Sequence, residues 1–113
     1  MSPATLETDG LKSRAALFAA LGDETRLSML SRLAGGRARS IARLTEGTNL
    51  TRQAVTKHLR VLEEAGVLTR RKAGRESLYA LEPGSLADLR DYLDHVSRQW
   101  DDALARLRAF VED

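Results

Sequence analysis

The stretch that most constrains the fold of this chain is TRQAVTKHLRVLEEAG, residues 51–66. Val55, Leu59 and Leu62 recur at helical spacing, which predicts an amphipathic helix with one buried stripe. Thr51 can cap the start of this helix, and the final glycine can end it. The opposite face is polar and has no acidic side chain; it carries Gln53, Thr56, Lys57 and Arg60, with Arg52 at its rim.

Three further helices are expected before residue 51. The first covers about residues 10–21, with Leu11, Ala15, Phe18 and Leu21 on one stripe, and residues 1–9 are expected to be flexible. Asp23 can cap the second helix, whose stripe is Leu27, Leu30 and Leu33. Ser40 can cap a third, short helix with Ile41, Ala42 and Leu44 facing inward. This short helix, a glycine-containing turn and the helix from Thr51 predict a helix-turn-helix over about residues 40–65.

After residue 66 the pattern changes to the period of a β-strand. Residues 67–81, VLTRRKAGRESLYAL, alternate apolar and polar side chains on both sides of a glycine-containing tip, which predicts a β-hairpin. Its tip and first arm are basic, with Arg70, Arg71, Lys72 and Arg75.

The last segment, about residues 84–112, predicts one long helix. Its apolar residues follow a heptad seam, namely Leu86, Leu89, Leu93, Val96, Trp100, Ala103, Leu107 and Phe110. A helix of about 27 residues is about 40 Å long, more than a domain of this size needs for its own core. We therefore expect the seam to join two copies of the chain, although packing within one chain would also explain it. The predicted fold is mainly α with a small β-hairpin, as a single domain over residues 10–113.

Composition and charge narrow the class of protein. The chain has 113 residues and no cysteine, which excludes disulfides and thiolate chemistry. It has no apolar run of membrane-spanning length and no leader-like start, so we expect a cytoplasmic protein without a membrane partner. The net charge of +2 is uneven: residues 51–75 hold seven Lys or Arg against two acids, and residues 76–113 hold four against nine.

The basic helix face and the basic hairpin together predict binding to double-stranded DNA. Arginine and lysine suit guanine edges, glutamine suits adenine, and threonine suits either of these bases or a thymine methyl. The helix N-terminus and the hairpin can hold phosphates. Each feature alone has a simpler explanation, since charge runs are often solvated surface and a basic hairpin tip can protect a sheet edge. A winged-helix module that binds only proteins is the alternative function.

The stretches GDETRLSMLSRL, residues 51–81 and RQWDDALARLRAFVE resemble the ArsR-type family of small bacterial winged-helix repressors. The resemblance covers about residues 11–112. Its most specific part is the family pattern that Thr51, Val55, Thr56, His58 and Leu59 match. The resemblance implies a homodimeric repressor joined by its first and last helices, with two recognition helices on an inverted-repeat operator.

Two sets of site residues follow from the pattern and the resemblance. The expected DNA contacts are Thr51, Arg52, Gln53, Thr56, Lys57, His58, Arg60, Arg70, Arg71, Lys72 and Arg75. The expected dimer interface is Leu11, Phe18, Leu86, Leu89, Leu93, Val96, Trp100, Leu107 and Phe110. His58 is assigned to the DNA contacts, and packing and hydrogen bonding within the domain is the alternative.

The sequence departs from the metal-sensing members of that family. It lacks their cysteines, and Leu93 and Arg106 stand where their last-helix ligands are expected around His95. We therefore expect no metal and no cofactor; the alternative is a metal-sensing repressor with non-cysteine ligands, drawn from Asp91, Asp94, His95, Asp101 and Asp102. We expect any small-molecule inducer to bind around Phe18, Tyr92 and Trp100. No phosphate loop or nucleophile–base set is present, so we expect no enzymatic activity.

Overall fold

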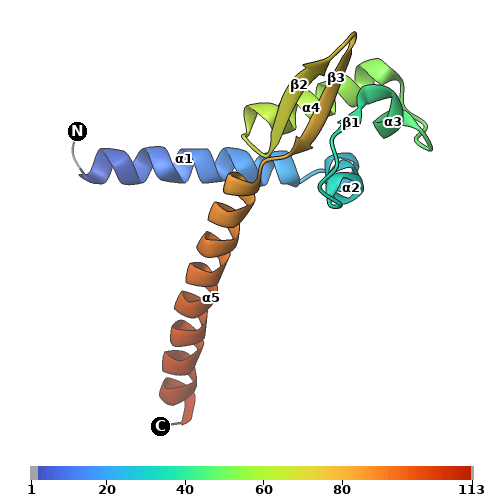
Figure 1. Ribbon diagram of the computed structural model, residues 1–113. Helices are drawn as coiled ribbons and strands as arrows, with labels where there is room; N and C mark the ends of the chain where they lie inside the picture. Colours follow the sequence, from blue (N-terminus) through green and yellow to red (C-terminus); the bar gives the residue numbers. More distant parts are fainter. Residues whose placement is uncertain (1–2, 113) are drawn as a thin grey trace. The chain divides into compact units, whose positions relative to one another are not determined.

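The computed structural model describes the backbone of residues 3–112 and the side chains of residues 10–112. The chain forms two compact units, one ending at Glu82 and the other beginning at Pro83. Figure 1 shows the element order, four helices and a small sheet in the first unit and one long helix in the second.

The first two helices are α1 (Pro3–Leu21) and α2 (Glu24–Leu33). We expected the first helix to begin near Gly10, but it begins at Pro3, and proline is favoured in the first turn of a helix. The expected flexibility of the N-terminus stays a prediction, and residues 1–2 lie outside the described residues. In the same way, the expectation of a single domain stays a prediction.

Asp23 caps α2, as the sequence predicts: its Oδ2 accepts a hydrogen bond from the Arg26 amide at 3.0 Å. The buried stripe of α2 is shifted from the expected one. Met29 and Leu33 are buried, whereas Leu27 is 51% exposed. Leu30, the other residue of the expected stripe, is partly buried and packs against the core. Only Leu27 therefore departs from the prediction, and Met29 takes an inward position that the helical spacing did not single out.

The helix-turn-helix consists of α3 (Ile41–Thr45) and α4 (Arg52–Glu64). Ser40 Oγ accepts from the Arg43 amide at 3.2 Å, and Thr51 Oγ1 accepts from the Ala54 amide at 3.1 Å, so both predicted caps form. The predicted stripe of α4, Val55, Leu59 and Leu62, is completely buried.

The sheet has three antiparallel strands in the order β1-β3-β2, comprising β1 (Arg39–Ser40), β2 (Leu68–Ala73) and β3 (Glu76–Leu81). β2 and β3 are the predicted hairpin, and Gly74 has a φ of +65° in its turn, where a residue with a side chain would be strained. β1 was not predicted, because two residues are too short for an alternation to be visible. It pairs Arg39 with Tyr79.

The core of the first unit joins α1, α2, α3, α4 and the two hairpin strands β2 and β3. Its buried members are Ala20, Met29, Leu33, Leu44, Val55, Leu59, Leu62, Leu68 and Tyr79. Because side chains from α1, α2, α3 and both hairpin strands close around α4, this helix is held on its buried side and its polar face is left to solvent.

The second unit is the single helix α5 (Pro83–Glu112), as predicted within one residue. None of its residues is buried, and Trp100 and Phe110 are 66% and 79% exposed. The apolar face is wider than the predicted heptad seam, since Leu104 and Val111 are also exposed. None of the helices over the described residues is long and apolar enough to cross a membrane.

Candidate nucleic-acid interface

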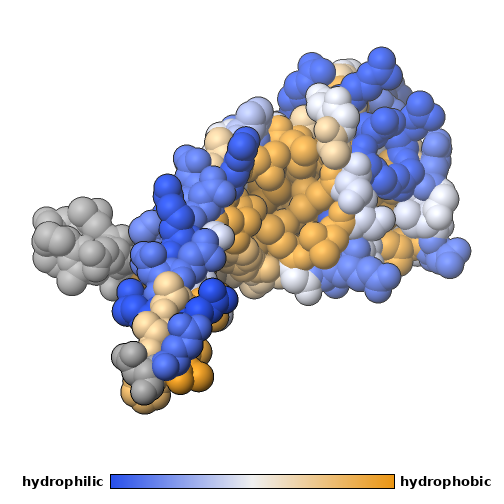
Figure 2. All heavy atoms as spheres, turned by 90° about the horizontal axis from the view of Figure 1, so that it is seen from below, coloured by the Kyte–Doolittle hydropathy of each residue, from blue (hydrophilic) through white to orange (hydrophobic). Residues whose placement is uncertain are grey.

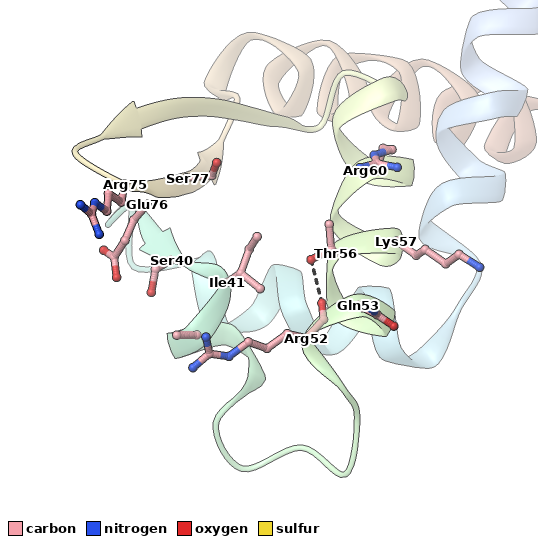
Figure 3. A pocket seen from close by; sticks show the side chains of 11 residues that line it. Ser40, Ile41, Arg52, Gln53, Thr56, Lys57, Arg60, Arg75, Glu76 and Ser77 are labelled. Carbon is pink, nitrogen blue, oxygen red and sulfur yellow. Dashed lines mark hydrogen bonds between the residues drawn. The ribbon is translucent and has the colours of Figure 1, made fainter.

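A groove of about 600 Å³ runs between the start of α3, the outer face of α4 and the tip of the hairpin. Figure 3 shows the side chains of these three elements around it. The groove is lined by Ser40, Ile41, Ala42, Arg52, Gln53, Thr56, Lys57, Arg60, Arg75, Glu76 and Ser77. Because the apolar stripe of α4 is buried in the core, the opposite, polar face of the helix lies toward the groove. This is why helical periodicity in the sequence could predict the α4 residues of the lining.

The groove is strongly cationic. Arg52, Lys57, Arg60 and Arg75 line it against one carboxylate, Glu76. All five of these side chains are exposed, so their charges face solvent and whatever ligand enters. The first turn of α4 also contains no acidic residue, which leaves the partial positive charge of the helix end uncompensated. This combination suits a polyanion.

The structure brings together six of the eleven predicted DNA contacts: the five residues of the α4 face and Arg75. Arg71 and Lys72 are exposed on β2 outside the groove lining. Arg70 is also outside it, and its Nε lies 3.3 Å from Glu63 Oε2 in an ion pair. Thr51 uses its hydroxyl oxygen as the cap of α4.

His58 is likewise not among the groove residues and faces α2. Its side chain is 25% exposed, and its Nδ1 lies 3.3 Å from Arg26 Nη1 and 3.8 Å from Asp23 Oδ2. This geometry favours the within-domain interpretation of His58 that the sequence left open.

The pKa of the Asp23 carboxyl is lowered from its ordinary value. The first cause is the hydrogen bond from the Arg26 amide, which stabilises the ionised form; the charges of Arg26 and His58 act in the same direction, against partial desolvation. Asp23 is therefore a carboxylate at neutral pH.

Sequence reasoning missed part of the groove and two structural arginines. The rest of the groove lining is formed by Ser40, Ile41, Ala42, Glu76 and Ser77. No local sequence pattern marks these residues as part of a site, because only the tertiary structure places the start of α3 beside the hairpin tip. Arg26 donates to the carbonyls of Ala19 and Ala20, at the end of α1. Arg32 donates to the carbonyls of Leu44, Arg43 and Glu46 at 2.6, 3.1 and 2.8 Å, at the end of α3.

No group of three or more His, Asp or Glu side chains gathers at metal-binding distance in the part of the chain whose side chains are described. The acidic residues of α5 that the sequence offered as an alternative metal site thus form no such cluster within one copy.

A helix-turn-helix followed by a basic hairpin defines the winged helix-turn-helix class of DNA-binding domains. Residues 21–71 match the family model described as a helix-turn-helix domain. The HTH-type transcriptional regulator Rv2034 of Mycobacterium tuberculosis is 40% identical over 93 residues, which cover 82% of this chain and 83% of that protein. The transcriptional repressor SmtB of the same organism is 30% identical over 102 residues, covering 90% and 73%.

Solved structures with a similar fold include a transcriptional regulator and a winged helix-turn-helix domain. An ArsR-like transcriptional regulator from Rhodococcus sp. RHA1 is 32% identical, with a TM-score of 0.76, and the match covers 90% of this chain and 95% of that one. The homodimeric winged helix-turn-helix domain Mb0332 from Mycobacterium bovis shares the fold at 22% identity, with a TM-score of 0.69 and coverage of 88% and 89%.

The chain belongs to the ArsR/SmtB family of winged helix-turn-helix transcriptional regulators. It is a transcriptional regulator with a helix-turn-helix DNA-binding domain, and its relatives are regulators rather than enzymes, as the sequence predicted.

Proposed function

We propose that the chain is a homodimeric repressor that binds an inverted-repeat operator through the groove between α4 and the hairpin. The observation that carries this proposal is the cationic groove itself, in which Arg52, Gln53 and Lys57 stand on one exposed helix face beside Arg75 of the hairpin tip. Base edges in the major groove of DNA are contacted by such a helix, and phosphates by the flanking cations.

Base readout is assigned to the α4 face, Arg52, Gln53, Thr56, Lys57 and Arg60. Phosphate contacts are assigned to Thr51, Arg70, Arg71, Lys72 and Arg75. Two of these have competing partners within the chain: Arg70 must leave or share Glu63, and the Thr51 oxygen already accepts from an amide. Arg71 and Lys72, which are exposed on β2, are the stronger candidates for phosphate anchors.

Dimerisation is supported by apolar surface on both units, each considered alone. In the first unit, Leu11 and Phe18 of α1 are 59% and 39% exposed. Figure 2 shows an apolar area on the face that α1 and α2 turn toward the viewer. In the second unit, the exposed face of α5 includes Trp100, Leu107 and Phe110. Exposed apolar surface of this extent is typical of an interface.

The width of the apolar face of α5 indicates how many helices pack against it. A strict heptad seam matches one partner helix, whereas added apolar side chains such as Leu104 and Val111 broaden the stripe to a width that packs against more than one helix. The α1 and α5 helices of a second copy would supply two. The homodimeric Mb0332 domain has the same fold. Repression is inferred from SmtB, which is named a repressor.

The test is selection of binding sites from a pool of random duplexes with the purified full chain. We expect enrichment of an inverted repeat whose half-sites are centred about 34–36 Å apart, roughly one turn of DNA, or a multiple of that distance. Enrichment of a single unrepeated motif would contradict the dimeric arrangement. No enrichment by a folded protein would contradict sequence-specific binding and favour the protein-interaction module.

A further inference from the structure

The hydroxyl of Thr56 is already engaged within its own helix. Thr56 Oγ1 donates a hydrogen bond to the Arg52 carbonyl at 2.7 Å, drawn as the dashed line in Figure 3. A threonine hydroxyl has only one proton to donate, so this bond leaves its oxygen lone pairs and its methyl group to the groove. Because the oxygen is folded back onto the preceding turn, the methyl branch is the less encumbered of the two.

The groove has a small apolar surface beside Thr56. Ile41 and Ala42, at the start of α3, line the same groove, and both are partly buried. Ile41 packs against the core on one side, and Figure 3 shows its side chain pointing toward the α4 turn that carries Thr56. Most other groove residues are charged or polar. A phosphate gains nothing from an apolar contact, whereas the C5-methyl of thymine is the apolar group that bases present in the major groove.

We infer that Thr56, with Ile41 beside it, selects one thymine in each half-site through the C5-methyl group of that base. This inference rests on the proposed function and makes it more specific. The hydroxyl does not contribute as a donor, because its proton is held by the Arg52 carbonyl. The competing mode, in which an amino group of adenine or cytosine donates to Thr56 Oγ1, requires the oxygen rather than the methyl group.

The experiment uses the duplex enriched in the selection and replaces each thymine singly by deoxyuridine, which lacks only the C5-methyl. Binding of the full chain is measured by fluorescence polarisation. For the wild type we expect one thymine per half-site whose replacement weakens binding about fourfold, the value of one buried methyl group. Thr56→Val keeps a methyl at the same branch point and should keep this loss. Thr56→Ser has no methyl and should lose the sensitivity at that thymine alone.

Thr45→Ser is the matched control. Thr45 Oγ1 makes the same bond, to the Ile41 carbonyl at 2.7 Å, but Thr45 does not line the groove, so this variant should keep the wild-type sensitivity. Thermal unfolding followed by circular dichroism verifies that all three variants fold.

The inference is overturned if deoxyuridine is tolerated at every thymine, or if Thr56→Ser stays as sensitive as the wild type. It is also overturned if Thr56→Val loses preference for an adenine or cytosine, since the hydroxyl would then be the contact. Each of these results leaves the proposed function intact. Failure of the selection to enrich any sequence removes the proposed function, and the inference with it.

Discussion

Two groups of arginines in the first unit have the same chemistry but different contacts. Arg52, Arg60 and Arg75 are exposed around the groove. Arg26 and Arg32, both on α2, instead bind backbone carbonyls at the ends of α1 and α3. Helix ends carry partial negative charge at their carbonyls, and guanidinium groups satisfy several of them at once. Net charge alone therefore overstates the number of cations available to DNA.

Gln53→Ala tests base readout at the residue scale. Gln53 is exposed on α4 and lines the groove, so its loss should not disturb the core. We expect binding to the selected operator to weaken by about 1–3 kcal/mol and preference to relax at one base pair. Polarisation against a set of single-base operator variants measures both. Equal weakening on every duplex would assign Gln53 to the DNA backbone instead.

Asp23→Asn tests the contribution of the Asp23 charge to folding. The pKa of Asp23 is below its ordinary value of 3.8 in the folded chain. The folded state thus favours the carboxylate, and its stabilisation is present above about pH 4 and is lost as the pH falls through the range below that value. Asparagine can still cap α2 but has no charge.

We expect the wild type to have the higher urea midpoint at about pH 5 and the difference to shrink toward about pH 3. A difference that stays the same at both pH values would mean that the charge of Asp23 contributes nothing to folding and that only its cap matters.

At the scale of elements, the orientation of α3 depends on an anchor outside the helix-turn-helix. α3 has only five residues and one fully buried side chain, Leu44. Arg32 of α2 binds three carbonyls at its C-terminal end, at distances of 2.6 to 3.1 Å. Because Ile41 and Ala42 belong to this short helix and line the groove, we expect the anchor to keep that wall of the groove in place.

Arg32→Ala should therefore weaken operator binding although Arg32 does not line the groove. Losing charge-assisted bonds of this kind costs about 1–3 kcal/mol of folding stability. Arg32→Lys, which retains the charge but cannot bridge three carbonyls, should recover only part of the affinity. Polarisation with a thermal melt on each variant separates the two effects. Wild-type affinity in a folded Arg32→Ala protein would show that the anchor is dispensable.

Sequence patterns predicted most elements because each carries a local signal. The stripe of α4, its Thr51 cap and the Gly74 turn of the hairpin are all readable within a few residues. β1 could not be predicted, because it exists only through its pairing with β3. The stripe of α2 was misplaced at Leu27, since the choice between adjacent helical faces depends on what α1 and α4 present to it.

The candidate site also combines residues that the local sequence predicts with residues that only the tertiary structure reveals. The α4 face was predictable from helical periodicity, and Arg75 from the basic tip. The lining by Ser40, Ile41 and Ala42 requires knowledge of where α3 meets the hairpin. His58 shows the limit most clearly, since its sequence context fits a DNA contact while its Nδ1 lies beside Arg26 of another helix.

At the scale of the whole molecule, the proposal requires two copies. Trp100 is 66% exposed on α5, so Trp100→Ala removes interface area without removing core packing from either unit. We expect the variant to sediment as a monomer at concentrations where the wild type is a dimer, and to bind the inverted repeat more weakly. Gln99→Ala, one position away and outside the heptad seam, is the matched control. A fully dimeric Trp100→Ala protein would place the interface elsewhere.

The central claim, sequence-specific binding through a cationic groove, is tested most directly by one measurement. Fluorescence polarisation of the full chain is recorded on the selected operator and on a scrambled duplex, from about 50 to about 200 mM salt. We expect tighter binding to the operator at every salt concentration. We also expect affinity to fall steeply with salt, on the order of 10³-fold if Arg71, Lys72 and Arg75 of both copies make six phosphate contacts. Equal affinity for both duplexes, or an affinity that salt leaves unchanged, would contradict the claim.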